Sequence, residues 1–247
     1  LFRSLVLRGR ALDAEATRVG NRAARETLER AIQLAPSYAD AYAELGDVTF
    51  QRAMFGWSEF GQQDIEDAIA LAQKAIEIDG DSVLGHSVLA RAFAAIQKYD
   101  LALAESERAL QINPSDAEVL LARAAVLLWI GRIDDSMATA EAAARLNVNI
   151  GPEASLNLGL AYLLGGRYDD VVKLVEAARV RYPDYPLLDF PLAGAYAELG
   201  RLDEAGEALG RARRKNPLMD AGSFGTRFQN AALQRRVEES LRKAGLN

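Results

Sequence analysis

The stretch ERALQINP at residues 107–114 decides the fold, because close copies of it recur along the chain. The copies are ERAIQLAP (29–36), QKAIEIDG (73–80), AAARLNV (142–148), EAARVRYP (176–183) and GRARRKNP (210–217). Their last residues follow one another at intervals of 44, 34, 34, 35 and 34 residues. Four of the five intervals match a period near 34, which is typical of a helical repeat array. The long first interval indicates an insertion, which we place at residues 51–64.

Each period divides into two amphipathic stretches that read as helices. Gly131, Gly166 and Gly200 separate the two stretches in three of the units, and Gly supplies the positive φ that ends a helix there. Small residues recur at fixed places in the second stretch, where they let two helices approach closely. One such series lies five residues before each unit's end and consists of Ala75, Ala109, Ala143, Ala178 and Ala212.

Composition excludes several classes of function. The 247 residues include no Cys and a single His, so thiolate sites, multi-histidine metal sites and most His-based catalytic relays are ruled out. The formal net charge of −6 argues against a general nucleic-acid binder, and no apolar run reaches the roughly 18–20 residues needed to span a bilayer. We therefore expect no catalytic, cofactor-binding or metal-binding residues, no nucleic-acid partner and no membrane insertion. A cysteine-free chain fits the cytoplasm, and the periplasm is the alternative.

The repeat resembles the tetratricopeptide repeat. The best-matching unit carries Leu158, Gly159, Tyr162, Ala178 and Pro183 at the places where that family has its characteristic residues. The resemblance covers about residues 1–217, and it implies an all-α fold, a right-handed α-solenoid of about six helix–turn–helix units. The expected units are 1–36, 37–80, 81–114, 115–148, 149–183 and 184–217, and residues 218–247 are expected to form a cap of short helices.

A second resemblance concerns the two ends of the chain. The opening LVLRGRALDAEATRVGNRAARETLERAI and the ending ESLRKAGLN are similar to the C-terminal repeat regions of bacterial multidomain proteins such as class III adenylate/guanylate cyclases. This similarity implies that the chain is a regulatory or assembly module. Because the chain opens at Leu1 rather than Met, we expect it to derive from a longer parent.

The family resemblance implies that the first helices of successive units line a concave face on which partners bind. Counting positions from the start of each unit gives the candidate residues of this groove. They are Arg91, Glu118, Leu121, Leu128, Trp129, Leu156, Asn157, Leu160 and Phe190. The leucines and aromatic residues of this set give the groove an apolar floor, and Glu118 belongs to its acidic edge. Such a groove suits an apolar or basic peptide. The alternative is that the leucines only pack against neighbouring repeats.

The function that follows is a non-catalytic scaffold for a peptide or protein partner of unknown identity. A possible homodimer is the rival hypothesis, in which the apolar stripe of residues 224–241 or the N-terminal helix packs against a second copy. An enzyme working through carboxylates alone is a third hypothesis. The aromatic residues of the insertion, Met54, Phe55, Trp57 and Phe60, form either a binding loop or a cover for an over-long helix pair, and we favour the cover. His86 is expected to serve packing.

Overall fold

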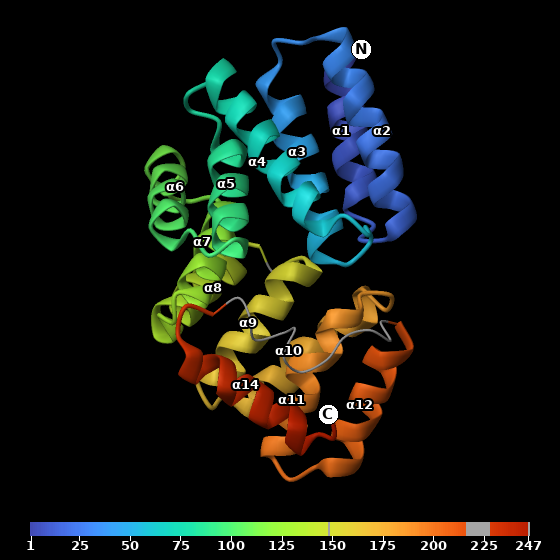
Figure 1. The fold of residues 1–247 in the computed structure, drawn as a ribbon, viewed down its shortest axis with the longest axis vertical. Coiled ribbons are helices and arrows are strands. Elements are labelled where there is room, and N and C mark those ends of the chain that lie inside the picture. The colour runs from blue at the N-terminus through green and yellow to red at the C-terminus, as the bar shows by residue number, and fades with distance from the viewer. Residues whose placement is uncertain (148, 216–227, 247) are drawn as a thin grey trace. The chain divides into compact units, whose positions relative to one another are not determined.

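The computed structural model describes residues 1–147, 149–215 and 228–246, and within them every regular element is a helix. The chain divides into two compact units, Leu1–Arg123 and Ala124–Asn247, which we describe separately (Figure 1). The all-α repeat fold expected from the sequence is confirmed. The boundaries of the six repeat units stay a prediction. The predicted unit ends Val148 and Pro217, and the first part of the predicted cap with Phe224, lie outside the described residues.

The first unit is built from helix pairs that pack in chain order. Its helices are α1 (Phe2–Asp13), α2 (Arg18–Leu34), α3 (Ala39–Met54), α4 (Gly61–Ile78), α5 (Val83–Ala95), α6 (Tyr99–Ile112) and the first part of α7 (Ala117–Trp129). The two helices of each pair lie against each other, and α3 also lies against α1, α2 and α5. The core is made of small and branched side chains, among them Ala24, Leu28 and Ala31 of α2 and Ala41 and Val48 of α3.

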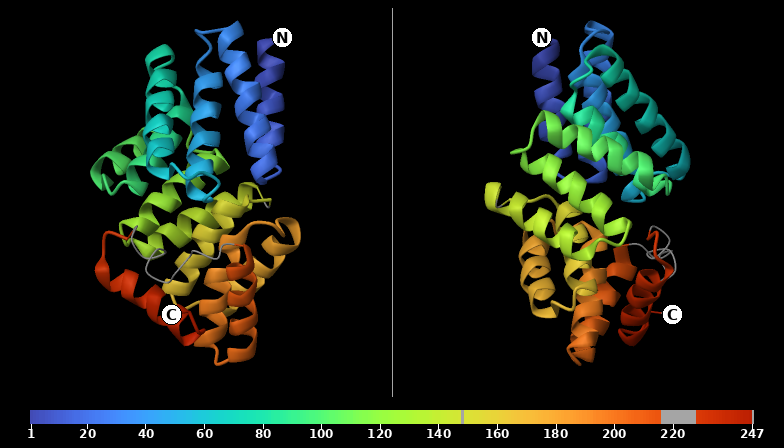
Figure 2. Two further views of the ribbon diagram at one scale, coloured as in Figure 1. Left: turned by 45° about the vertical axis from the view of Figure 1, so that its right-hand side comes forward. Right: turned by 90° about the vertical axis from the view of Figure 1, so that its left-hand side faces the viewer.

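The second unit continues the same pattern and ends with one further helix. It contains the last part of α7, then α8 (Ile133–Leu146), α9 (Pro152–Leu164), α10 (Tyr168–Arg181), the 3-10 turn η1 (Pro186–Leu188), α11 (Asp189–Glu198), α12 (Leu202–Lys215) and α14 (Ala231–Lys243). The first helices of successive pairs, α9 and α11, lie side by side, and α14 lies against both (Figures 1 and 2).

Glycine and alanine set how closely the helices approach. A Cβ atom placed on Gly159 of α9 would lie 3.1 Å from Val175 Cγ2 of α10 and 3.4 Å from Pro191 Cγ of α11, so this crossing has little room for a side chain. The turns that precede α8, α10 and α12 contain Gly131, Gly166 and Gly200 with φ of +88°, +74° and +76°. Gly adopts positive φ without the steric cost that other residues have, which explains why Gly lies between the two helices of these units.

The insertion in the second repeat lengthens its helices as well as its loop. Compared with α5, α6 and the three residues between them, α3 is three residues longer, α4 is four longer, and the loop from Phe55 to Phe60 is three longer. Phe55 is buried and meets the Trp57 ring edge-on, with 4.6 Å between the ring centroids. Phe60, in contrast, is 68% exposed. The aromatic cover that we favoured therefore holds for Phe55 and leaves Phe60 in solvent.

Candidate interaction surface

In the second unit, helix α14 packs on the surface formed by α9 and α11. Helix α14 begins at the N-cap Asn230, whose side chain accepts a hydrogen bond of 2.9 Å from the backbone N–H of Ala232. Leu233, Val237 and Leu241 recur at four-residue spacing, so they share one side of α14, and all three are buried. A single apolar stripe therefore attaches α14 to the rest of the unit.

The start of this attachment is an aromatic contact at the end of α7. The rings of Trp129 and Phe228 have centroids 4.9 Å apart, and the backbone N–H of Gln229 donates to the Trp129 carbonyl at 2.8 Å. Leu233 lies in the first turn of α14, and its Cδ1 atom is 3.0 Å from the position that a Cβ on Gly131 would occupy. The C-terminal segment thus meets the end of the first helix of the fourth pair before it reaches α9.

Farther along α14, polar groups fix it to the ends of α9 and α11. Arg236 donates to the Leu164 carbonyl at 2.7 Å, where the last turn of α9 leaves carbonyl groups without a helical partner. Ser240 and Lys243 donate to the Glu198 carboxylate of α11 at 2.8 Å and 2.7 Å. Burial alone would raise the pKa of Glu198, but the hydrogen bonds from Lys243 and Ser240 outweigh it and the pKa lies below its ordinary value.

Gly194 lies where α11 meets both α9 and α14. A Cβ placed there would lie 3.4 Å from Ser240 Cβ and 3.0 Å from Leu163 Cδ2. Trp129 of α7, Leu164 of α9 and Glu198 of α11 belong to three different helices, yet all three contact the segment 228–243. The unit therefore presents a surface that accepts an amphipathic helix along its first helices.

The residues predicted for the groove divide by burial. Leu128, Leu160 and Phe190 are enclosed, with exposures of 1% or less, and Leu121 and Leu156 are also buried. In the free chain these leucines and Phe190 pack among the helices. Glu118 is exposed, Asn157 is partly exposed, and Trp129 lies under Phe228. As contacts to an external partner, all of these residues stay predictions.

Arg91, the predicted groove residue of the first unit, lies in a polar cluster formed by α1, α3 and α5. It forms an ion pair with Asp47 and lies over the Phe50 ring, 5.1 Å from its centroid. The Gln51 side-chain amide donates to Asp47 at 3.0 Å and to Asp13 of α1 at 2.7 Å. Burial, with the negative charge of Asp47 adding to it, raises the pKa of Asp13 to about 7.

Asp47 and Arg91 occupy the same position in consecutive repeats, the ninth residue of α3 and of α5. Counting positions within the repeat assigned Arg91 to the predicted groove. It did not indicate that the two residues pair with each other. Equivalent positions of adjacent repeats are neighbours in such an array. Applying this rule to the sequence would have predicted that Asp47 and Arg91 lie close together.

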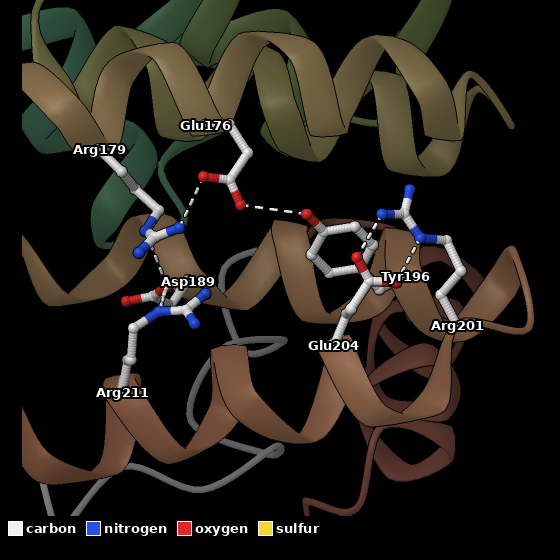
Figure 3. Close-up of polar contacts among 7 residues, drawn as sticks. All are labelled: Glu176, Arg179, Asp189, Tyr196, Arg201, Glu204 and Arg211. Carbon is white, nitrogen blue, oxygen red and sulfur yellow. Dashed lines mark hydrogen bonds and ion pairs between the residues drawn. The ribbon is translucent and has the colours of Figure 1, made fainter.

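A second set of polar contacts joins the pairs of the second unit and repeats with the helices (Figure 3). The Tyr196 hydroxyl of α11 donates to Glu176 of α10 at 3.0 Å, and the Arg201 guanidinium lies 4.5 Å from the Tyr196 ring centroid and binds Glu204. One repeat earlier, Tyr162 donates to Glu141 at 3.0 Å, while Arg167 lies over the Tyr162 ring.

This contact set was absent from our sequence interpretation. Its signal is a Tyr followed five residues later by Arg, with an acidic residue three positions after that Arg: Tyr162, Arg167 and Asp170, and then Tyr196, Arg201 and Glu204. Burial first, and then the hydrogen bond to Glu141, raises the pKa of Tyr162 to about 12, so its proton remains in place as a donor. These contacts join helices of the same unit and hold successive helix pairs together.

Buried Asp189 at the start of α11 completes this network (Figure 3). Its Oδ1 atom forms an ion pair with Arg179 of α10 at 3.1 Å and accepts a hydrogen bond from Arg211 of α12 at 2.9 Å. One carboxylate thus ties three helices together. Arg211 belongs to the basic run at the end of α12, and this contact gives it a structural role.

The acidic residues and the single His of the described segments are dispersed or engaged in the fold. No group of three or more His, Asp or Glu side chains in those segments is placed to hold a metal ion. His86 is buried, with Nδ1 2.6 Å from Glu105 and Nε2 3.2 Å from the Gly80 carbonyl oxygen, and it joins α5 to α6. Among the described helices, none is long and apolar enough to cross a membrane.

The comparison with known families decides the identity of the repeat. The profile described as tetratricopeptide repeat matches residues 53–117 and 121–186, which is more than half of the chain. The chain belongs to the tetratricopeptide repeat family. This fold serves as a protein–protein interaction scaffold, because stacked helix pairs provide extended binding surfaces.

Solved structures agree on the fold. Cut9–Hcn1 from the APC/C hetero-tetramer superposes with a TM-score of 0.65 at 13% identity, over 91% of this chain and 39% of that one. Pseudomonas aeruginosa PilF gives 0.57 at 22% identity, over 84% and 89%. PilW, a type IV pilus biogenesis factor, gives 0.55 at 22% identity, over 81% and 87%. At these identities the likeness concerns the fold alone.

A distant relative matches part of the sequence. Putative adenylate cyclase 3 of Rhizobium meliloti (strain 1021) is 28% identical over 96 residues, which are 39% of this chain and 16% of that protein. The match therefore covers about a sixth of the relative's length. It agrees with the resemblance to cyclase repeat regions that the sequence suggests.

Proposed function

We propose that this chain is a non-catalytic scaffold that binds a peptide or protein segment along the first helices of its repeats. The observation that carries the proposal is the position of α14, an amphipathic helix held on α9 and α11 by one apolar stripe and by hydrogen bonds to helix ends. A surface that accepts this helix has the shape and the polar groups that a helical partner segment needs.

The proposal extends to a place in a larger bacterial protein. The distant match to a putative adenylate cyclase, most of whose length lies outside the matched stretch, supports the role of a regulatory or assembly module in a signalling protein. The carboxylates of the chain support a scaffold better than an enzyme. Asp13 and Asp47 are bridged by Gln51, and Asp47 is neutralised by Arg91, so these groups are engaged with one another.

A random library of 16-residue peptides, panned against the full chain, tests the scaffold function. We expect enriched peptides to bind in fluorescence anisotropy, and Glu118→Gln and Asn157→Ala, at the accessible predicted groove residues, to weaken binding about 5-fold each, as moderate interface contacts do. Glu207→Gln on the exposed side of α12 is the matched control and should leave the affinity unchanged.

Two results would contradict this function. One is that no peptide is enriched above the level seen with an unrelated helical protein. The other is that affinity falls with Glu207→Gln and stays unchanged with Glu118→Gln and Asn157→Ala, because binding would then use the second helices.

Homo-oligomerisation is the second candidate, and the exposed apolar residues of the first helix pair favour it. Leu7 of α1 and Val19 of α2 are 63% and 67% exposed. The described residues of the 224–241 stripe are buried within their own unit, so the N-terminal pair is the better surface for a second copy. Light scattering over a dilution series tests this: a mass that falls on dilution, and a monomer with Leu7→Glu, would support it, whereas a constant monomer mass would exclude it.

A further inference from the structure

Helix α14 differs from the helices that it covers in how much of it is buried. In α11, nine of the ten residues are buried, whereas α14 buries four of its thirteen, Leu233, Val237, Ser240 and Leu241. The remaining surface of α14 carries Arg235, Glu239, Arg242 and Lys243 in solvent. α8 and α10 bury three of their fourteen residues each, but described helices precede and follow them in the unit, whereas α14 packs on α9 and α11 from one side among the described helices. A helix packed on one side opens locally at a lower free energy than the core, and a charged outer side keeps a released helix soluble.

The surface under α14 recognises features that any amphipathic helix can carry. The Leu164 carbonyl receives Arg236, Gly194 leaves room for the small Ser240, and Glu198 receives Lys243. On α14 these three residues stand at positions i, i+4 and i+7, which lie along one side of a helix. The buried residues Leu233, Val237 and Leu241 form the apolar stripe beside them.

We propose that the surface formed by the ends of α7, α9 and α11 is a receptor for a basic amphipathic helix of a partner protein, and that α14 is its internal, displaceable occupant. The partner helix has a cation at i, a small residue at i+4 and a cation at i+7, beside an apolar stripe. It replaces α14 and takes over its contacts with Trp129, Leu164 and Glu198. This inference rests on the proposed scaffold function and adds the chemistry of the partner and its regulation.

Competition from within the chain sets how strongly the partner binds. A tethered segment has an effective concentration on the order of mM for its own site, so a free helix gains access only in proportion to the fraction of molecules in which α14 has left. Any change that weakens α14 therefore raises the apparent affinity for the partner.

A disulfide lock tests the inference with one protein in two states. A Cβ on Gly194 lies 3.4 Å from Ser240 Cβ, close to the roughly 3.5–4.5 Å separation found in disulfides, and the natural chain has no other Cys. We expect the reduced Gly194→Cys/Ser240→Cys variant to bind a labelled peptide of residues 228–246 at least 10-fold more tightly than the oxidised form, when the peptide carries Ser240→Gly to leave room for the introduced thiol. The single variants Gly194→Cys and Ser240→Cys control for the reductant and should give equal binding in both conditions.

A second pair of variants leaves the receptor surface intact. Val237→Asp places a charge in the buried stripe, and Ala232→Asp places the same charge on the exposed side of α14. Val237→Asp should bind the peptide at least 10-fold more tightly than the natural chain, and Ala232→Asp should bind like the natural chain. Equal binding by the two variants would overturn the inference.

Hydrogen exchange of the natural chain supplies a test that needs no substitution. If α14 is displaceable, its amides exchange at least 100-fold faster than those of α9 and α11. Exchange of all three helices in a single step would make α14 an integral part of the unit and refute the inference.

The outcomes separate the inference from the function on which it rests. If library peptides bind the natural chain and the oxidised lock equally well, the scaffold function stands and the role of α14 fails. If no peptide binds the natural chain, the reduced double variant or Val237→Asp, both fail.

Discussion

At the scale of single residues, the polar cluster of the first unit brings two carboxylates, Asp13 and Asp47, close together, which costs electrostatic free energy when both are ionised. Asp13 has only uncharged hydrogen-bond donors, the amides of Gln51 and Asn21, while the negative charge of Asp47 lies nearby. Arg91 compensates Asp47, and within the described part of the chain no Lys or Arg side chain forms an ion pair with Asp13. The ionised form of Asp13 is therefore unfavourable in the folded chain.

Asp13→Asn should make the first unit more stable above neutral pH. The pKa of Asp13 is about 7 in the folded chain and near 3.8 in the unfolded one, so the folded chain keeps a proton that the unfolded chain loses. Stability of the natural chain then falls as the pH rises from about 4 to about 7 and is level above that. We expect Asp13→Asn to remove this slope and to raise the free energy of unfolding by about 1–3 kcal/mol at pH 8 relative to the difference at pH 5. Urea titrations at the two pH values check this, and an equal difference at both would refute it.

The sequence allowed some of these residues to be placed and left their partners open. Counting within the repeat placed Arg91 and Trp129 on the first helices, because a 34-residue period assigns each residue a position. Their partners Asp47 and Phe228 were not predicted. Asp47 holds the same repeat position as Arg91, so the repeat period could have shown it as a neighbour. Phe228 lies 99 positions after Trp129 and outside the period, and no local pattern specifies that contact.

At the scale of single elements, α12 offers a test of what glycine does at a turn and inside a helix. Gly200, before α12, has φ of +76°, whereas Gly206 lies within α12 with no atom near the position of a Cβ. Gly200→Ala should lower the free energy of unfolding by about 1 kcal/mol, because Ala is strained at positive φ. Gly206→Ala should raise it by about 0.5–1 kcal/mol through helix propensity. Thermal melts of the two variants should shift in opposite directions, and a shift in the same direction would disprove the assignment.

The small residues at helix crossings give a second prediction at this scale. Ala102 of α6 is fully buried, and Ala104 on the same helix is exposed. Ala102→Leu should overpack the crossing and cost about 1–3 kcal/mol, whereas Ala104→Leu should change stability by less than about 0.5 kcal/mol. Urea denaturation followed by circular dichroism measures both values. Similar costs for the two substitutions would mean that the crossing is not tightly packed.

At the scale of the whole molecule, stability should be distributed repeat by repeat. Each helix pair contacts chiefly its neighbours in the chain, and such arrays behave as sums of local and nearest-neighbour terms. Ala102→Leu in α6 should therefore speed amide exchange in α5 and α6 by at least 10-fold while leaving α9 and α11 within about 2-fold. Mass-spectrometric hydrogen exchange checks this, and a uniform acceleration along the chain would show global cooperativity instead.

The whole molecule also shows why fold and site differed in predictability. Helices, turns and the repeat arise from local patterns, such as Ala178 five residues before Pro183, and these patterns determined the all-α repeat fold correctly. The stripe of Leu233, Val237 and Leu241 predicted a helix with one buried side. It did not reveal that this side covers α9 and α11 and reaches the end of α7, because an amphipathic pattern specifies a stripe and leaves its neighbour open.

The single carboxylate of Asp189 between Arg179 and Arg211 has a consequence for how this sequence can evolve. Loss of the carboxylate alone breaks the ion pair of Arg211 and leaves Arg179 paired with Glu176, and loss of one arginine leaves the buried acid half compensated. Replacing all three by apolar side chains of similar volume is far better tolerated, as in other buried ion clusters. Drift at these three positions is therefore strongly epistatic: each first step is harmful, although the completed triple exchange is close to neutral.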